Sequence, residues 1–179
     1  MYRCSPVKKS AQTRLHISVA KQRLTLKRGR TTERTYPIST SKYGLGSKEG
    51  SYKTPTGKFR IAEMIGAGQP TDTAYKARVP IRASAAELNA DDLVMSRILW
   101  LDGLEEANAN TFGRYIYIHG TNHEEQIGEP ASHGCVRMKN ADVAELFELV
   151  EVGTPVVIAP PKPRGRPVKK PNKSVAPGV

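Results

Sequence analysis

One cysteine and three histidines lie within 17 positions of the chain, and their types and spacing suit nucleophilic chemistry. They are His119, His123, His133 and Cys135. A thiol is a strong nucleophile only as the thiolate, so its ordinary pKa of about 8.5 has to be lowered by a nearby base. Imidazole suits that task near neutral pH. Gly134 lets the adjacent backbone adopt a positive φ, and backbone amides around Cys135 could then form an oxyanion hole.

Two other interpretations of these residues stay open on spacing alone. Cys135 can be a buried structural cysteine surrounded by surface histidines. The same four residues can also be zinc ligands, although the paired CxxC and HExxH spacings typical of zinc sites are absent. For His123, which lies in a polar stretch, a surface position is favoured over either role.

Short apolar stretches that alternate with polar residues predict a mostly β protein around this segment. Tyr115–His119 (YIYIH) alternates most regularly, and it ends on a histidine placed to act as a base. The other expected strands are His16–Val19, Arg23–Leu26, Arg34–Ile38, Lys58–Ala62, Arg97–Leu101 and Pro155–Ala159. Alternating βα units are absent, which favours an antiparallel sandwich or barrel.

Helical signals are few. Ser84-Ala-Ala-Glu87 has the spacing of a capping box, and Asn89–Ser96 is expected to form a further short turn or helix. Asn140 is expected to cap a helix over Ala141–Val150 whose apolar residues share one face. Trp100 is expected to lie in the core, and the polar stretch Gly66–Tyr75 to form a surface loop or lid.

The net charge of +11 belongs to the two ends of the chain. Fifteen of the 28 Lys and Arg residues lie in residues 1–30 and 160–179, which contain no acidic residue, so residues 31–159 hold 13 basic against 17 acidic residues. This distribution disfavours a compact basic nucleic-acid-binding domain. We expect a disordered basic arm over 1–13, a single domain over 14–159, and a disordered tail rich in Pro, Lys and Arg over 160–179.

Neither a membrane span nor a secretory signal is visible. No apolar run approaches the 18 or so residues of a transmembrane helix. The basic start is followed by a stretch that charged residues interrupt, which indicates a cytoplasmic chain or one whose leader is missing. Two cysteines are too few for a disulfide scaffold, and Cys4 is expected to be incidental.

The segment from His119 to Met138 resembles the catalytic motif of the L,D-transpeptidase (YkuD-type) family of peptidoglycan enzymes. The family pattern is His, usually followed by Gly-Thr, then a spacer, then Ser-His-Gly-Cys and often Arg and Met. Here it reads His119-Gly120-Thr121, the spacer Asn122–Ala131, and Ser132-His133-Gly134-Cys135-Val136-Arg137-Met138. Lys21–Leu24, Pro37–Thr40, Thr54–Phe59 and Asn140–Val157 also resemble family segments in order, so the similarity covers about residues 14–159.

The resemblance implies catalytic roles for three residues. Cys135 matches the nucleophile, and His119 matches the base that activates it. The backbone carbonyl that holds this histidine in the family would here belong to Gly120. His133 matches a second histidine that orients or polarises groups near the oxyanion.

The resemblance also implies residues that line the substrate site. Arg137 matches a position suited to gripping a substrate carboxylate, with a structural salt bridge as the alternative. Ser132 and Gly134 match positions that shape the cysteine loop. Together with Arg137 and Gly120, they are the residues expected to line the substrate site.

The implied fold is a mainly β, YkuD-like sandwich with one or two short helices and the cysteine in a catalytic loop. The implied reaction joins Cys135 as a thioester to the third residue of a peptidoglycan stem tetrapeptide, releases D-alanine, and passes the acyl group to an amine. Water as acceptor would make the protein an L,D-carboxypeptidase instead. No metal or organic cofactor is implied. The family's location implies the cell envelope or periplasm, with the cytoplasm as the alternative.

The tail suggests a rival function. Pro163–Pro167 (PRGRP), followed by more basic residues, resembles an AT-hook that enters the minor groove of A·T-rich DNA. Chance composition is the favoured explanation, and attraction to anionic wall polymers or lipid headgroups ranks above DNA binding. The expected partners are therefore stem peptides, with nucleic acid disfavoured. The acceptor stays open, because Gly66–Arg82 matches no pattern, and the oligomeric state stays open as well.

Overall fold

The structure, a computed structural model, describes residues 12–84 and 92–161. Most of the expected arm with Cys4, most of the expected tail with the AT-hook-like Pro163–Pro167, and the Glu87 half of the expected capping box lie outside these residues. The predicted domain boundaries therefore stay a prediction. Within the described ranges, no helix is both long enough and apolar enough to span a membrane.

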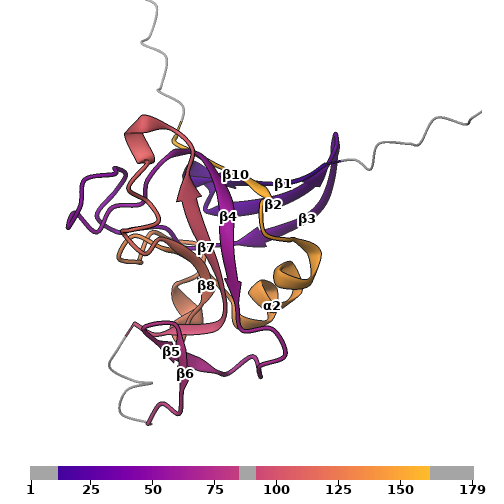
Figure 1. Ribbon diagram of the computed structural model, residues 1–179, viewed down its shortest axis with the longest axis vertical. Helices are drawn as coiled ribbons and strands as arrows, with labels where there is room; N and C mark the ends of the chain where they lie inside the picture. Colours follow the sequence, from indigo (N-terminus) through magenta and orange to yellow (C-terminus); the bar gives the residue numbers. More distant parts are fainter. Residues whose placement is uncertain (1–11, 85–91, 162–179) are drawn as a thin grey trace, which may run out of the picture.

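Ten strands form one mixed sheet, hydrogen-bonded in the order β3-β2-β1-β10-β4-β7-β5-β6, with β8 added to β7 and β9 to β8 (Figure 1). The strands are β1 (Thr13–Ser18), β2 (Arg23–Arg28), β3 (Thr31–Pro37), β4 (Gly57–Ile65), β5 (Ala74–Lys76), β6 (Val79–Ile81), β7 (Val94–Gly103), β8 (Tyr117–Gly120), β9 (Val136–Met138) and β10 (Pro155–Ala159). The β1–β10 and β8–β9 pairs are parallel, so the sheet is mixed and the purely antiparallel expectation is wrong.

Helical structure is sparse among the described residues. It comprises α2 (Asn140–Leu149) and the 3-10 turns η1 (Val19–Lys21), η2 (Glu106–Asn108) and η3 (Glu124–Gln126). The helix packs against β7 and β8 and lies beside the curved strands in Figure 1. The mainly β fold predicted from alternation is confirmed.

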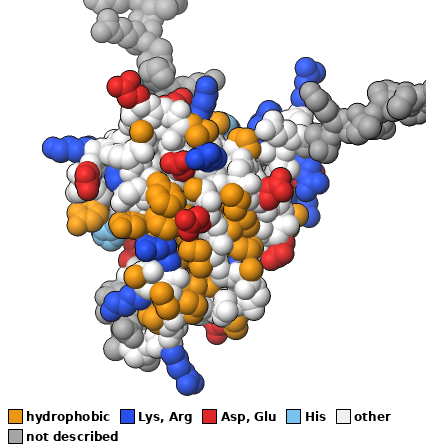
Figure 2. Space-filling model, in the orientation of Figure 1, with side chains coloured by type: hydrophobic (Ala, Val, Ile, Leu, Met, Phe, Trp, Pro, Cys, Tyr) orange, Lys and Arg blue, Asp and Glu red, His pale blue; other side chains and the backbone are white. Residues whose placement is uncertain are grey.

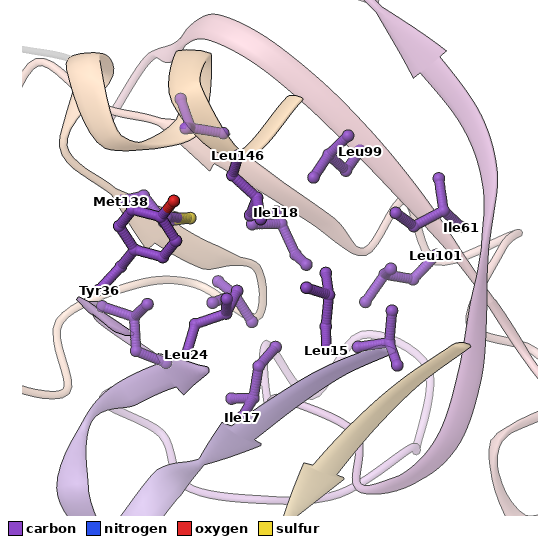
Figure 3. Close-up of a cluster of buried hydrophobic side chains, with 14 of the residues drawn as sticks. Leu15, Ile17, Leu24, Tyr36, Ile61, Leu99, Leu101, Ile118, Met138 and Leu146 are labelled. Atoms are coloured by element: carbon purple, nitrogen blue, oxygen red, sulfur yellow. The ribbon is translucent and has the colours of Figure 1, made fainter. Parts of the chain in front are cut away.

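The main core lies between α2 and the inner faces of the strands. Its side chains come from alternate strand positions, such as Leu15 and Ile17 of β1, and they converge with Leu146 of α2 in Figure 3. Alternation places every second residue on this face, which explains why the short strands were visible in the sequence. Burying each Leu or Ile side chain stabilises the fold by roughly 1.5–3 kcal/mol relative to exposure.

A second, aromatic cluster lies on the other side of β7. Trp100 packs with Tyr75, Ile98 and Tyr117, and its ring stacks on Phe112 at 4.0 Å between centroids. The indole Nε1 donates a hydrogen bond to the Phe112 carbonyl at 3.1 Å. Trp100 is only 6% exposed, which confirms its predicted place in the core.

Tertiary pairing moves several predicted boundaries. The strand expected from Tyr115 begins at Tyr117, because Tyr115 has a φ of +57° that ends the extended conformation. The cap of α2 is Lys139; Asn140 lies inside the helix, and its side chain donates to the Thr121 carbonyl at 2.9 Å.

Two expected non-strand stretches also contribute residues to the sheet. Val94–Ser96, expected to belong to a turn or helix, is the start of β7. Ala74 and Tyr75, expected in a loop, begin β5, which pairs with β7. Pairing with a neighbouring strand overrides the local pattern in both places.

Candidate active site

The parallel β8–β9 pair brings the predicted catalytic residues to one face of the sheet. Its register sets Ile118 opposite Val136 and His119 opposite Arg137. Ile118 and Val136 belong to the hydrophobic core, so alternation turns His119 and Arg137 to the opposite face. Cys135 immediately precedes β9 and therefore shares the face of His119 and Arg137.

The Cys135 thiol is held by the backbone of the neighbouring strand. Its Sγ accepts from the Tyr117 amide at 3.4 Å and donates to the Tyr115 carbonyl at 3.4 Å. Burial raises the pKa of Cys135 to about 11, and the Tyr117 amide and the charges of Arg137 and Arg114 offset only part of this. The expectation of a thiol pKa lowered by a base is therefore wrong for the resting structure, in which the thiol is neutral.

His119 is fixed in one orientation at the end of β8. It is 4% exposed, and its Nδ1 lies 2.5 Å from the Gly120 carbonyl, which is the contact that the family resemblance implied. A carbonyl oxygen can only accept, so Nδ1 carries the proton and Nε2 keeps a free lone pair. Burial lowers the pKa of His119 to about 4, which keeps the imidazole neutral near pH 7.

Thiol and imidazole thus rest as a neutral pair rather than an ion pair. Among the hydrogen bonds of the described residues, none joins His119 directly to Cys135. Catalytic hydrogen bonds are often loose before substrate binds, so a base on the same face remains able to take the thiol proton.

The cysteine loop is tied down by hydroxyl groups. The Ser132 hydroxyl donates to the Cys135 carbonyl at 2.6 Å and accepts from the Gly134 amide at 3.3 Å. Thr54, from the segment that resembles the family's Thr-Pro-x-Gly turn, donates to the Gly134 carbonyl at 2.9 Å. Gly134 has a φ of +125°, as its type predicted. Its amide is already bonded, so it is not a free oxyanion donor.

Arg137 forms an ion pair inside the protein. It is 2% exposed, its Nη1 lies 2.9 Å from Asp92 Oδ1, and its Nη2 donates to Gln126 Oε1 at 3.2 Å. This geometry matches the salt-bridge alternative. The substrate-gripping role predicted for Arg137 would require this pair to open.

Asp92 is the site residue that the sequence did not reveal. Its Oδ1 faces Arg137 and its Oδ2 lies 3.1 Å from His133 Nδ1. Desolvation would raise the pKa of the carboxyl, but the hydrogen bond from His133 and the charge of Arg137 outweigh it, so the pKa is lowered. Asp92 therefore stays ionised and joins two motif residues. The only sequence signal was a pair of acids just before an apolar strand.

His133 lies at the outer rim of the site, next to two exposed aromatic residues. Its ring centroid is 5.7 Å from that of Tyr43 and 6.2 Å from that of Tyr52. Tyr43 and Tyr52 are 47% and 60% exposed. The rim of the cysteine loop is thus aromatic, and the Asp92 carboxylate orients the imidazole through Nδ1.

The structure gives no support to the zinc alternative: in the described part of the chain, no three His, Cys, Asp or Glu side chains are grouped so that they could hold a metal ion. His123 contacts its own loop instead: Asn122 at 3.2 Å and Glu125 at 3.4 Å. This local contact agrees with the surface position favoured for His123.

Two cavities differ in their relation to the site. One of about 440 Å³ lies between the β5–β6 hairpin and the start of β7, with Asp92 in its lining. A larger one of about 670 Å³ lies among the start of β1, the end of α2 and the start of β10, and none of the candidate residues lines it. The face drawn in Figure 2 gathers hydrophobic side chains around the hairpin. Of the candidate site residues, Asp92 alone lines one of these two cavities, the smaller one.

Comparison with known proteins places this chain in a family. A model of the YkuD L,D-transpeptidase catalytic domain matches residues 12–158. The putative L,D-transpeptidase YkuD of Bacillus subtilis is 30% identical over 142 residues, which are 79% of this chain and 63% of that protein.

Solved structures share the fold. A crystal structure of an L,D-transpeptidase from Xylanimonas cellulosilytica has a TM-score of 0.55 at 21% identity, covering 88% of this chain and 65% of that one. L,D-transpeptidase 3 of Mycobacterium tuberculosis, crystallised with a faropenem-derived adduct, has a TM-score of 0.52 at 18% identity and covers 83% and 60%. This chain spans less than two thirds of each of these three relatives. Because the family match covers most of its length, the chain belongs to the L,D-transpeptidase catalytic domain (YkuD) family.

Proposed function

We propose that this chain is an L,D-transpeptidase that acts on peptidoglycan stem peptides. The observation that carries the proposal is the placement of Cys135 and His119 on one face, with a neutral thiol and a neutral imidazole whose Nε2 is free. A neutral pair of this kind transfers its proton as the thiol attacks, rather than storing a thiolate beforehand.

The acylation step uses both residues. Sγ of Cys135 attacks the carbonyl carbon of the third stem residue while His119 Nε2 takes the thiol proton. The tetrahedral intermediate then expels the amine of the terminal D-alanine, and His119 returns the proton to that leaving nitrogen. The C–N bond to the terminal D-alanine is broken and a thioester bond to Cys135 is formed, and this step requires no cofactor.

The second step restores the thiol. An amine from another stem attacks the thioester, His119 takes a proton from it, and the departing sulfur recovers that proton. If water attacks instead, the product is a shortened stem and the activity is that of a carboxypeptidase. The substrate lies in the cell wall, so we propose that the protein works in the cell envelope.

Asp92 and His133 are proposed to support the acylation transition state. The carboxylate holds His133 Nδ1 at 3.1 Å, which directs the other ring nitrogen away from Asp92. The position of His133 two residues before the nucleophile suits a donor near the developing oxyanion.

Incubation with a disaccharide-tetrapeptide, followed by mass spectrometry, tests the proposal. A cross-linked dimer is expected; a tripeptide product would indicate the carboxypeptidase, and no change with either acceptor would overturn both. Cys135→Ser should abolish turnover, because an imidazole activates a hydroxyl far less readily than a thiol. Cys4→Ser is the matched control and should leave turnover unchanged.

Acylation can also be followed without an acceptor. Faropenem leaves an adduct in the M. tuberculosis relative, and one adduct is expected here in the wild type. An adduct of the same mass that survives in the Cys135→Ser protein would point to another nucleophile.

A further inference from the structure

The stem peptide of the proposed reaction carries carboxylates close to the scissile bond, and two of the arginines around the thiol are already engaged. Arg137 is buried and paired with Asp92. Arg114 donates to two backbone carbonyls, of Gly46 at 3.3 Å and of Lys53 at 2.8 Å. A substrate carboxylate would have to displace these contacts, so another cation is needed.

Arg78 reaches the site from the turn between β5 and β6. The turn consists of Ala77 and Arg78, with φ of +48° and +68°, although such turns favour Gly or Asn at both positions. A strained backbone conformation of this kind persists only where contacts with the surrounding structure stabilise it. Here the Arg78 side chain makes such contacts, because its guanidinium lies over the ring of Trp100 at 4.8 Å and over that of Tyr115 at 5.1 Å.

The same side chain is linked to the residues that hold the thiol. Nη1 of Arg78 donates to the Tyr117 hydroxyl at 3.3 Å, and the Tyr117 amide donates to Cys135 Sγ. Cys135 packs against the aromatic cluster that contains Trp100 and Tyr117. The Arg78 guanidinium and the Cys135 thiol therefore pack against the same aromatic cluster.

The Tyr117 residue contacts both groups. Desolvation raises the pKa of its hydroxyl, and the hydrogen bond and charge of Arg78 lower it. With its hydroxyl on Arg78 and its amide on Sγ, Tyr117 lies between the arginine and the nucleophile.

We infer that Arg78 binds a carboxylate of the stem peptide next to the carbonyl that Cys135 attacks. The inference rests on the proposed function and adds a specificity residue to it. Among the described residues, Arg78 makes a single hydrogen bond to a protein acceptor, which leaves most of its five N–H donors for a ligand. Half-burial against aromatic rings strengthens a charge-assisted bond, and the planar fork matches a carboxylate with two parallel contacts.

Two carboxylates of the donor peptide have the required chemistry. One is the C-terminal carboxylate of the leaving residue, and the other is the side-chain carboxylate of a diaminopimelate at the third position. Three tetrapeptide donors separate them: the free acid, the C-terminal amide and the peptide amidated on the third side chain.

The experiment compares kcat/KM of wild type and Arg78→Gln on the three donors. Wild type should lose about 10- to 100-fold on the donor whose recognised carboxylate is amidated, the range expected for a charge-assisted hydrogen bond. Arg78→Gln should lose a similar factor on the free acid, chiefly through KM, and should lose nothing more on that amidated donor. Arg78→Lys should recover part of the loss, since it keeps the charge without the fork.

Arg82→Gln is the matched control, because it removes the same charge from an exposed position four residues further along. It should leave the discrimination between acid and amide donors intact. If Arg78 only braces Tyr117, Arg78→Gln will lower kcat/KM equally on all three donors and change the rate of Cys135 alkylation by iodoacetamide. That outcome overturns the inference and leaves the proposed function standing. An equal kcat/KM of the wild type on all three donors has the same meaning. A wild type inactive on every donor overturns the function itself and the inference with it.

Discussion

The two faces of the β8–β9 pair place different demands on the same short stretch of backbone. On one face, Ile118 and Val136 are fully buried among aliphatic side chains. On the other, His119 and Arg137 are almost as buried, at 4% and 2% exposed, yet both are polar and each has a specific partner. Burial on the first face supplies stability, whereas burial on the second sets protonation states.

This division means that neighbouring residues should fail in different ways. A change on the apolar face should lower the free energy of unfolding without changing the acylation rate of the molecules that remain folded. A change on the polar face should alter rate, pH dependence or ion pairing, and it should lower stability where it leaves a buried charge unpaired. Four experiments test this separation.

The largest effect is expected for His119→Ala. Losing a positioned general base lowers rates by typically 10²–10⁴-fold, and here no thiolate is stored to compensate, because the pKa of Cys135 is about 11. Formation of the faropenem adduct, measured by mass spectrometry against time at pH 7, should slow by that factor. An unchanged rate would remove His119 from the proposed mechanism and leave His133 as the candidate base.

Breaking the Asp92–Arg137 ion pair should destabilise the fold, and the two ends should differ. Asp92→Ala leaves a buried guanidinium without its carboxylate, at a cost of about 3–5 kcal/mol. Arg137→Met should cost less, because the Asp92 side chain is 27% exposed and water can solvate it. Urea unfolding of both variants and of the double variant measures this. The double variant should be more stable than Asp92→Ala alone; a double variant that loses the sum of the two single losses would mean that the pair is not coupled.

On the apolar face, Ile118→Ala should cost about 2–5 kcal/mol in the free energy of unfolding, since it leaves a cavity in the main core. The acylation rate of the folded fraction should change little, even though Ile118 adjoins His119 in the chain. A rate loss comparable to that of His119→Ala, with stability intact, would show that the two faces do not divide as argued.

The sequence predicted what depends on local pattern. Alternation located β2, β10 and the second half of β1, because each buries every second side chain; β1 begins three residues before the predicted start at His16. Residue types identified Cys135 and His119 as a thiol with a nearby imidazole, and the positive φ of Gly134 followed from the absence of a side chain.

What escaped prediction depends on contacts between distant segments. Asp92 meets His133 and Arg137 across 41 and 45 positions of the chain, and nothing near Asp92 in the sequence records those partners. The raised thiol pKa follows from burial by the packed site, so spacing alone gave the wrong sign. The turn at Arg78 carries neither Gly nor Asn, and its contacts with the aromatic cluster become visible only in the folded chain.

The smallest expected effect is a pH dependence that His119 imposes on both stability and rate. Its pKa is about 4 in the folded protein, against 6.5 for a free imidazole, so the unfolded chain binds more protons between these values. Stability is then fully present above pH 6.5 and is lost as the pH falls to 4, by at most about 3 kcal/mol. Urea unfolding at pH 7 and 4.5 should show this loss in wild type and a smaller one in His119→Gln, which keeps the contribution of His16 and other groups.

The acid limb of the acylation rate should likewise lie near pH 4, because His119 stays a neutral base down to that pH. A limb near pH 6.5 with equal acid sensitivity in His119→Gln would mean that the polar face is solvated, and the contrast between the two faces would disappear.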